Sequence, residues 1–111
     1  MSYRRACAAS DIPVGSVLAI DLGGDVDIAV VNTAEGFFAI EDRCSHADVA
    51  LSEGDVDGCT LECLAHGSRF DLRTGKPLEP PAVAPVATYP VRADGTDIFI
   101  DTDSPIDIQE Q

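Results

Sequence analysis

The chain has 111 residues and a formal net charge of −13, from 20 acidic and 7 basic side chains. This length allows one domain with one modest core, and the charge argues against nucleic acid, whose phosphates would repel it. No unbroken apolar run approaches the ~18 residues that a membrane-spanning helix needs. The pair Arg4-Arg5 is followed by too short an apolar stretch for an export signal, so we expect a cytoplasmic protein. The net negative charge predicts a basic partner.

Short apolar segments bounded by Gly, Asp, Asn and Ser fill the first part of the chain, which is typical of β-strands. We expect strands over residues 3–8, 17–22, 26–32 and 37–41. The stretch Gly23-Gly24-Asp25 should be the turn of a hairpin, because glycine adopts positive φ without steric cost. Strands at such even spacing predict an antiparallel barrel or sandwich.

The second part of the chain predicts two further hairpins and one lone strand. One hairpin pairs residues 50–56 with 59–62, a strand follows at 68–72, and the closing hairpin pairs 89–92 with 98–101. The dipeptide Asp57-Gly58 is a strong turn signal for the first of these hairpins. The sequence shows no internal repeat and no glycine-rich phosphate loop, so nucleotide binding has no support.

Two pairs of cysteine and histidine lie in the middle of the chain, Cys44-x-His46 and Cys63-x-x-His66. Thiolates and imidazoles are good ligands for iron and zinc, and four of them complete one site. The expected hairpin between the pairs would bring the second pair back beside the first. The spacing therefore indicates a metal or cluster site held by two tight loops.

These residues resemble the motif of the Rieske family, in which two cysteines bind one iron of a 2Fe-2S cluster and two histidines bind the other. The resemblance continues through Gly67, the segment 68–75 and the proline-rich segment 80–85. It implies that Cys44, His46, Cys63 and His66 bind one 2Fe-2S cluster. It also implies an all-β fold, an antiparallel sandwich or barrel with a two-loop cluster-binding subdomain.

The resemblance covers most of the chain and implies one Rieske domain over residues 1–103, with its cluster-binding part at about 42–85. Residues 104–111 would be an acidic, flexible tail. By similarity with the family, the proline-rich segment would pass over the cluster and shield it from water.

Zinc is the alternative metal, because two cysteines and two histidines also form structural zinc sites. In the usual zinc finger the two cysteines come first and the two histidines second. Here each loop contains one of each, which suits a diiron cluster with unlike ends. A zinc-stabilised interaction domain would be colourless and redox-silent.

The chain has no room for the catalytic domain with mononuclear iron that Rieske oxygenases carry, so the resemblance implies an electron carrier and not an enzyme. We expect a ferredoxin that passes electrons from a flavin-dependent reductase to a terminal non-haem iron oxygenase, such as a ring-hydroxylating dioxygenase. One alternative is an accessory redox or scaffold protein in iron-sulfur cluster assembly. Another is a small Rieske subunit of a different cytoplasmic reductase. The sequence does not predict the oligomeric state.

High-potential Rieske proteins carry an extra disulfide between the ligand loops, and a serine and a tyrosine that donate hydrogen bonds to cluster sulfurs. The positions that correspond to the disulfide are Val49 and Ala65, and Phe70 replaces the tyrosine, whereas Ser68 matches the serine. A missing donor destabilises the more negative, reduced cluster. We therefore expect a potential in the lower part of the Rieske range of roughly −150 to +300 mV.

Two cysteines, Cys7 and Cys59, lie outside the ligand pairs, and we expect them to stay free thiols in a reducing compartment. Between residues 35 and 62 the chain carries eight acidic side chains against Arg43 alone. This concentration of negative charge near the predicted ligands is the sequence's main indication of a basic partner.

Overall fold

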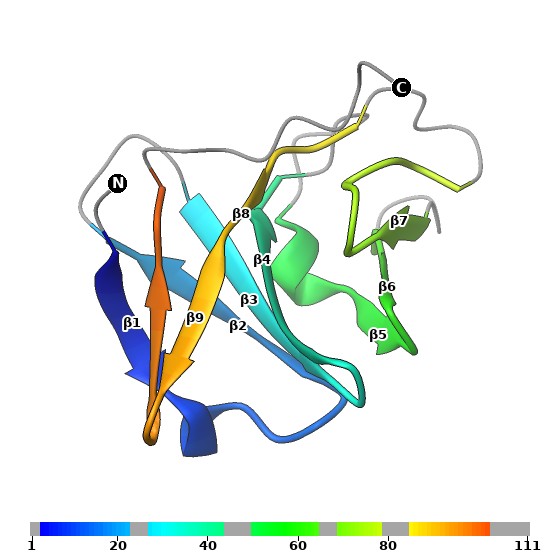
Figure 1. The fold of residues 1–111 in the computed structure, drawn as a ribbon. Coiled ribbons are helices and arrows are strands. Elements are labelled where there is room, and N and C mark those ends of the chain that lie inside the picture. The colour runs from blue at the N-terminus through cyan, green and yellow to red at the C-terminus, as the bar shows by residue number, and fades with distance from the viewer. Residues whose placement is uncertain (1–2, 23–26, 44–49, 65–68, 79–84, 103–111) are drawn as a thin grey trace.

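The computed structural model describes residues 3–22, 27–43, 50–64, 69–78 and 85–102 (Figure 1). The elements in these ranges are β1 (Arg4–Ala8), η1 (Ala9–Asp11), β2 (Ser16–Asp21), β3 (Asp27–Thr33), β4 (Gly36–Glu41), η2 (Leu51–Glu53), β5 (Asp55–Asp57), β6 (Thr60–Glu62), β7 (Arg69–Asp71), β8 (Thr88–Tyr89), β9 (Val91–Asp94) and β10 (Asp97–Ile100). The two η elements are single 3-10 turns. Among the described residues no helix is long and apolar enough to cross a membrane.

The strands form three antiparallel sheets, which we name by their position. The terminal sheet has the order β1-β10-β9, the central sheet β2-β3-β4-β8 and the small sheet β5-β6-β7. In Figure 1 the small sheet stands on the right, beside the two larger sheets. Every strand pair is antiparallel. The predicted all-β antiparallel fold is therefore confirmed.

Strand β3 lies in the middle of the molecule, and both of its faces are covered. Four consecutive apolar residues, from Ile28 to Val31, have no exposed surface. Successive side chains of a strand point to opposite faces, so Ile28 and Val30 pack on one side and Ala29 and Val31 on the other. This is why the strand reads as a continuous apolar run and not as an alternation.

The two faces of the central sheet cover two separate hydrophobic clusters. The terminal core, between the central and terminal sheets, contains Cys7, Ile12, Ile28, Val30, Ala39, Tyr89, Ile98 and Ile100. The loop-side core, between the central and small sheets, contains Ala29, Val31, Ile40, Leu51, Leu61, Cys63, Phe70, Leu72 and Val86. Full burial of one large apolar side chain contributes about 1.5–3 kcal/mol, so these clusters hold the three sheets together.

The strand predictions for the first 41 residues are confirmed to within one residue at most ends. The predicted turn at residues 23–25 lies outside the described residues, as does the tail 104–111. The hairpin around Gly58 is also confirmed, and this glycine has a φ of 61°.

Two predictions of strand extent are wrong. Residues 50–56 do not form one strand, because a 3-10 turn occupies Leu51–Glu53 and β5 begins at Asp55. Tyr89 does not belong to the closing hairpin but pairs with Ala39 in the central sheet. Pro90 separates the two sheets there, since proline has no N–H to continue a ladder.

Candidate metal centre

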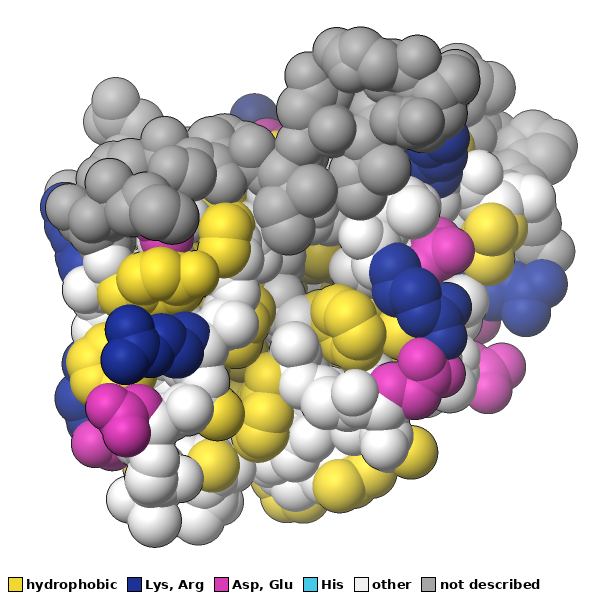
Figure 2. All heavy atoms as spheres, in the orientation of Figure 1, with side chains coloured by type: hydrophobic (Ala, Val, Ile, Leu, Met, Phe, Trp, Pro, Cys, Tyr) yellow, Lys and Arg dark blue, Asp and Glu magenta, His cyan; other side chains and the backbone are white. Residues whose placement is uncertain are grey.

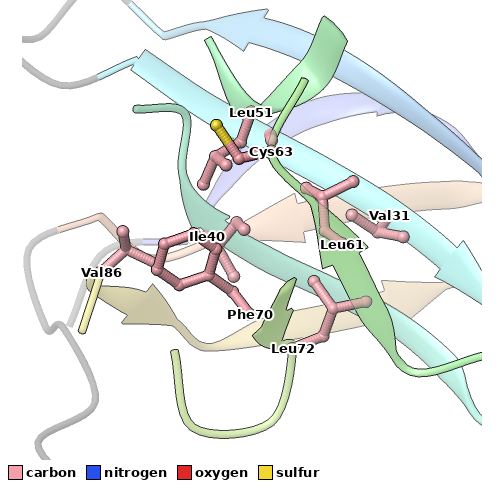
Figure 3. Close-up of a cluster of buried hydrophobic side chains, with 9 residues drawn as sticks. Val31, Ile40, Leu51, Leu61, Cys63, Phe70, Leu72 and Val86 are labelled. Carbon is pink, nitrogen blue, oxygen red and sulfur yellow. The ribbon is translucent and has the colours of Figure 1, made fainter. Parts of the chain in front are cut away.

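The structure describes one of the four predicted ligands, Cys63, directly after β6. Its side chain belongs to the loop-side core and is 1% exposed, and Figure 3 shows it beside Leu51. The next residue, Leu64, is 61% exposed. The other predicted ligands, Cys44, His46 and His66, lie outside the described residues. What the structure adds is the arrangement of the chain on either side of them.

The first ligand segment begins and ends at one pair of hydrogen-bonded residues. The Asp42 carboxylate accepts a hydrogen bond from the Ser52 backbone N–H (2.6 Å) and another from the Ser52 hydroxyl (2.7 Å). Asp42 is 8% exposed, and its own N–H donates to the carbonyl of Asp27 (2.8 Å). The described residues on either side of segment 44–49 are therefore held together beside the central sheet.

The second ligand segment begins and ends at neighbouring strands. Glu62, before Cys63, lies opposite Arg69 in the pairing of β6 with β7. The backbone of Gly54 packs directly against this point, because a Cβ on that residue would lie 1.7 Å from the Glu62 carbonyl oxygen. Only a residue without a side chain allows this approach. Gly54, which follows the first ligand segment, is therefore in contact with Glu62, which precedes the second.

The described residues on either side of the proline-rich segment are hydrogen-bonded to the same region. Before it, the Leu78 N–H donates to the carbonyl of Arg69 (2.7 Å). After it, the Val86 N–H donates to the carbonyl of Gly75 (2.8 Å), and the Glu41 N–H donates to the carbonyl of Ala87 (2.8 Å). We call the described residues on either side of each segment its base. The bases of the two ligand segments and of the proline-rich segment are thus linked, each to at least one of the others.

The residues present fit a Rieske cluster. The buried Cys63 lies in one apolar cluster with Leu51 and Val86, which follow the first ligand segment and the proline-rich segment, and this cluster would keep water away from a bound iron. The donor chemistry of the two predicted ligand pairs, one thiolate and one imidazole in each, matches a 2Fe-2S cluster with unlike ends. The described residues by themselves bring no three His, Cys, Asp or Glu side chains together as a metal site.

Three contacts at this site were not found by sequence reasoning. They are the Asp42–Ser52 hydrogen bonds, the Gly54 approach to Glu62 and the close contact of Gly75 with Val86. Their only sequence signal is position, since an acid, a serine and glycines flank the predicted ligand segments. Nothing in the sequence indicates which of these residues touch.

The other described cysteines are free thiols, as predicted. Burial raises the pKa of the Cys59 thiol, and the charge of Arg73 lowers it by a smaller amount. Burial, with a smaller effect of Asp11, also raises the pKa of the Cys7 thiol. Both side chains therefore stay protonated at neutral pH, which does not favour metal binding.

Exposed acidic and basic side chains lie next to each other on part of the described surface. Figure 2 shows Lys and Arg side chains next to Asp and Glu on the face that it presents. Arg5 pairs with Asp97 (3.0 Å), and Arg73 pairs with Glu35. Such exposed pairs contribute little to stability.

A family model described as "Rieske [2Fe-2S] domain" matches residues 2–90, and the chain belongs to this family. The 3-phenylpropionate/cinnamic acid dioxygenase ferredoxin subunits of Shigella boydii serotype 4 (strain Sb227) and Escherichia coli (strain K12) are each 47% identical over 102 residues. Each alignment covers 91% of this chain and 94% of the relative.

Solved structures agree with the sequence relatives. The ferredoxin of carbazole 1,9a-dioxygenase from Nocardioides aromaticivorans IC177 has a TM-score of 0.84 and 34% identity, covering 90% of this chain and 97% of its own. The Sphingomonas yanoikuyae B1 ferredoxin has a TM-score of 0.85 and 30% identity, covering 91% and 99%. The chain is thus a Rieske-type ferredoxin, an electron-transfer component and not a catalytic subunit.

Proposed function

We propose that Cys44 and Cys63 bind one iron, and His46 and His66 the other, of a single 2Fe-2S cluster. A bound Rieske cluster takes up and releases one electron at a time. The observation that carries the assignment is the buried Cys63 thiol at the linked bases of the ligand segments. The role of the chain is to hold the two ligand loops at a fixed separation and to keep water from the Cys63 thiolate.

We propose that residues 1–103 act as one domain, with about 42–85 as its cluster-binding part. The loop-side core supports this unit, because Ile40 of the central sheet packs in the same cluster as Phe70 of the small sheet (Figure 3). Burial of this shared core would couple the position of the ligand segments to the rest of the fold.

We further propose that the ferredoxin accepts electrons from a flavin-dependent reductase and delivers them to a terminal non-haem iron oxygenase, such as a ring-hydroxylating dioxygenase. Two similarities support this partner class. The relatives at 47% identity are named as dioxygenase ferredoxin subunits. A ferredoxin with 33% identity and a TM-score of 0.83 is described in a complex of reduced oxygenase and oxidised ferredoxin in carbazole 1,9a-dioxygenase, covering 88% of this chain and 91% of its own. The free thiols suit the cytoplasm.

The proposal is tested by electron transfer between purified partners. A flavin reductase and a terminal oxygenase are mixed with reduced nicotinamide, and oxygenase reduction is followed with and without the holoprotein. The account predicts that catalytic amounts of the ferredoxin accelerate the reduction by more than tenfold. No acceleration with any oxygenase, together with tight binding to cluster-assembly proteins, would contradict it. The metal-free chain is the control, because it has the same sequence but carries no electron.

A further inference from the structure

Asp42 connects the central sheet to the first ligand segment through two hydrogen bonds with one partner. Its two carboxylate oxygens accept separately from the N–H and the hydroxyl of Ser52, at 2.6 and 2.7 Å. Hydrogen bonds to an ionised group are short and roughly twice as strong as neutral ones. Because Asp42 is 8% exposed, little water competes for its oxygens.

The connection continues from Ser52 to the second ligand segment. Leu51 of the same 3-10 turn is fully buried in the loop-side core, and the Gly54 N–H donates to its carbonyl at 2.9 Å. Gly54 in turn lies against the Glu62 carbonyl, next to Cys63. The path from Asp42 to Cys63 thus runs through packed or hydrogen-bonded contacts.

We propose that Asp42 is a positioning residue for the cluster, which sets the separation of the first ligand pair from the second through Ser52 and Gly54. The proposal rests on the ligand assignment proposed above. In this proposal the buried Asp42 carboxylate is not a metal ligand, but it controls how slowly the two loops release the cluster. Groups that orient metal ligands in this way typically change metal affinity by roughly 10–100-fold when removed.

Thr33 offers a matched control at the other end of β4. It is 5% exposed, its hydroxyl donates to the Gly36 carbonyl (3.0 Å), and it accepts from the Glu35 N–H (3.0 Å). Thr33→Ala therefore also removes two hydrogen bonds of a buried polar side chain. It does so at the β3–β4 turn, which precedes β4, whereas Asp42 directly follows Glu41, the last residue of this six-residue strand.

The experiment measures the rate at which the holoprotein releases iron to a chelator, the line width of the EPR signal after reduction, and unfolding in urea. Asp42→Ala should release iron at least about tenfold faster than wild type and broaden the signal. Asp42→Asn keeps one acceptor and can donate to the Ser52 hydroxyl, so it should restore most of the retention. Ser52→Ala, which leaves the backbone N–H in place, should fall between them. Thr33→Ala should stay within about twofold of wild type.

Equal release rates for Asp42→Ala and Thr33→Ala, at matched unfolding stability, would overturn the positioning role and leave the ligand assignment intact. If Asp42→Ala does not fold, Ser52→Ala decides: iron release at the wild-type rate would overturn the role, and faster release with an unchanged urea midpoint would support it. A wild-type protein that binds no iron-sulfur cluster would overturn both proposals.

Discussion

The terminal core and the loop-side core bury similar side chains, but the elements that cover them differ. Strands of four to seven residues enclose the terminal core, and the pairing of β1 with β10 shifts register between Arg5 and Cys7. The loop-side core is covered by the three-residue strands β6 and β7 and by a single 3-10 turn. Long ladders supply their own hydrogen bonds, whereas the small sheet depends on particular contacts such as Asp42–Ser52 and Gly75–Val86. The region nearest the proposed cluster is thus the one with the shortest strands and the fewest ladder hydrogen bonds to stabilise it.

The largest difference between the regions should follow from Cys63→Ser. Serine oxygen is a poor substitute for a thiolate on iron, so we expect the cluster to be lost. Hydrogen exchange should then quicken in β5, β6 and β7 while β3 and β4 stay protected. Iron and sulfide analysis with exchange mass spectrometry measures both. Cys59→Ser, at a half-buried free thiol four positions earlier, should keep the cluster. Retention of iron by Cys63→Ser would refute the ligand role.

Phe70→Ala and Ile98→Ala compare the cores directly, since both side chains have no exposed surface. Each truncation should lower the free energy of unfolding, by about 3–5 kcal/mol for phenylalanine and about 2–5 kcal/mol for isoleucine. Only the Phe70 variant should also lose iron faster, because its cavity opens in the loop-side core. Urea unfolding and chelator-dependent iron release test the pair. Equal iron loss from both variants would mean that the two cores are not distinct in function.

Gly75→Ala and Gly95→Ala separate backbone strain from steric contact. Both glycines have positive φ, 78° and 65°, so alanine should cost roughly 1–2 kcal/mol at either position. A Cβ at Gly75 would also lie 2.0 Å from the Val86 carbonyl oxygen, whereas a Cβ at Gly95 meets nothing within 4 Å. Gly75→Ala should therefore be worse by a further ~1–3 kcal/mol in urea unfolding. Equal losses would remove the close contact from the account.

The smallest effect concerns the terminal core at alkaline pH. The pKa of the Cys7 thiol is raised above its ordinary value of 9.0, mainly by burial, so the unfolded chain loses this proton first. The stability due to the protonated thiol is complete below pH 9.0 and is lost as the pH rises through the folded pKa. Cys7→Ala should reduce the loss of stability between pH 8 and 10 by no more than about 1 kcal/mol. An unchanged pH profile would show that another group is responsible.

The sequence was sufficient where local chemistry decides the structure. Apolar runs and turn residues located the long strands, and Asp57-Gly58 located the short hairpin, because these signals act within a few residues. The family resemblance of the Cys-His pairs gave the class of cofactor. The lower-range redox potential stays a prediction, because Val49 and Ala65 lie outside the described residues.

The sequence was insufficient where contacts between distant residues decide the structure. The turn at Leu51–Glu53 depends on Asp42, ten residues before Ser52, and on Glu62 at the end of the next hairpin. Tyr89 pairs in the central sheet because β4 offers it a partner at Ala39, fifty residues earlier in the chain. No local pattern encodes either partner.

The central claim, that the two loops hold one Rieske cluster, is tested most directly by spectroscopy and metal analysis of one sample. Anaerobically purified protein is examined by absorption and EPR before and after dithionite, and its iron, sulfide and zinc are quantified. The account predicts two irons and two sulfides per chain and a rhombic EPR signal only after reduction. Colourless protein with one zinc per chain and no EPR signal would contradict it.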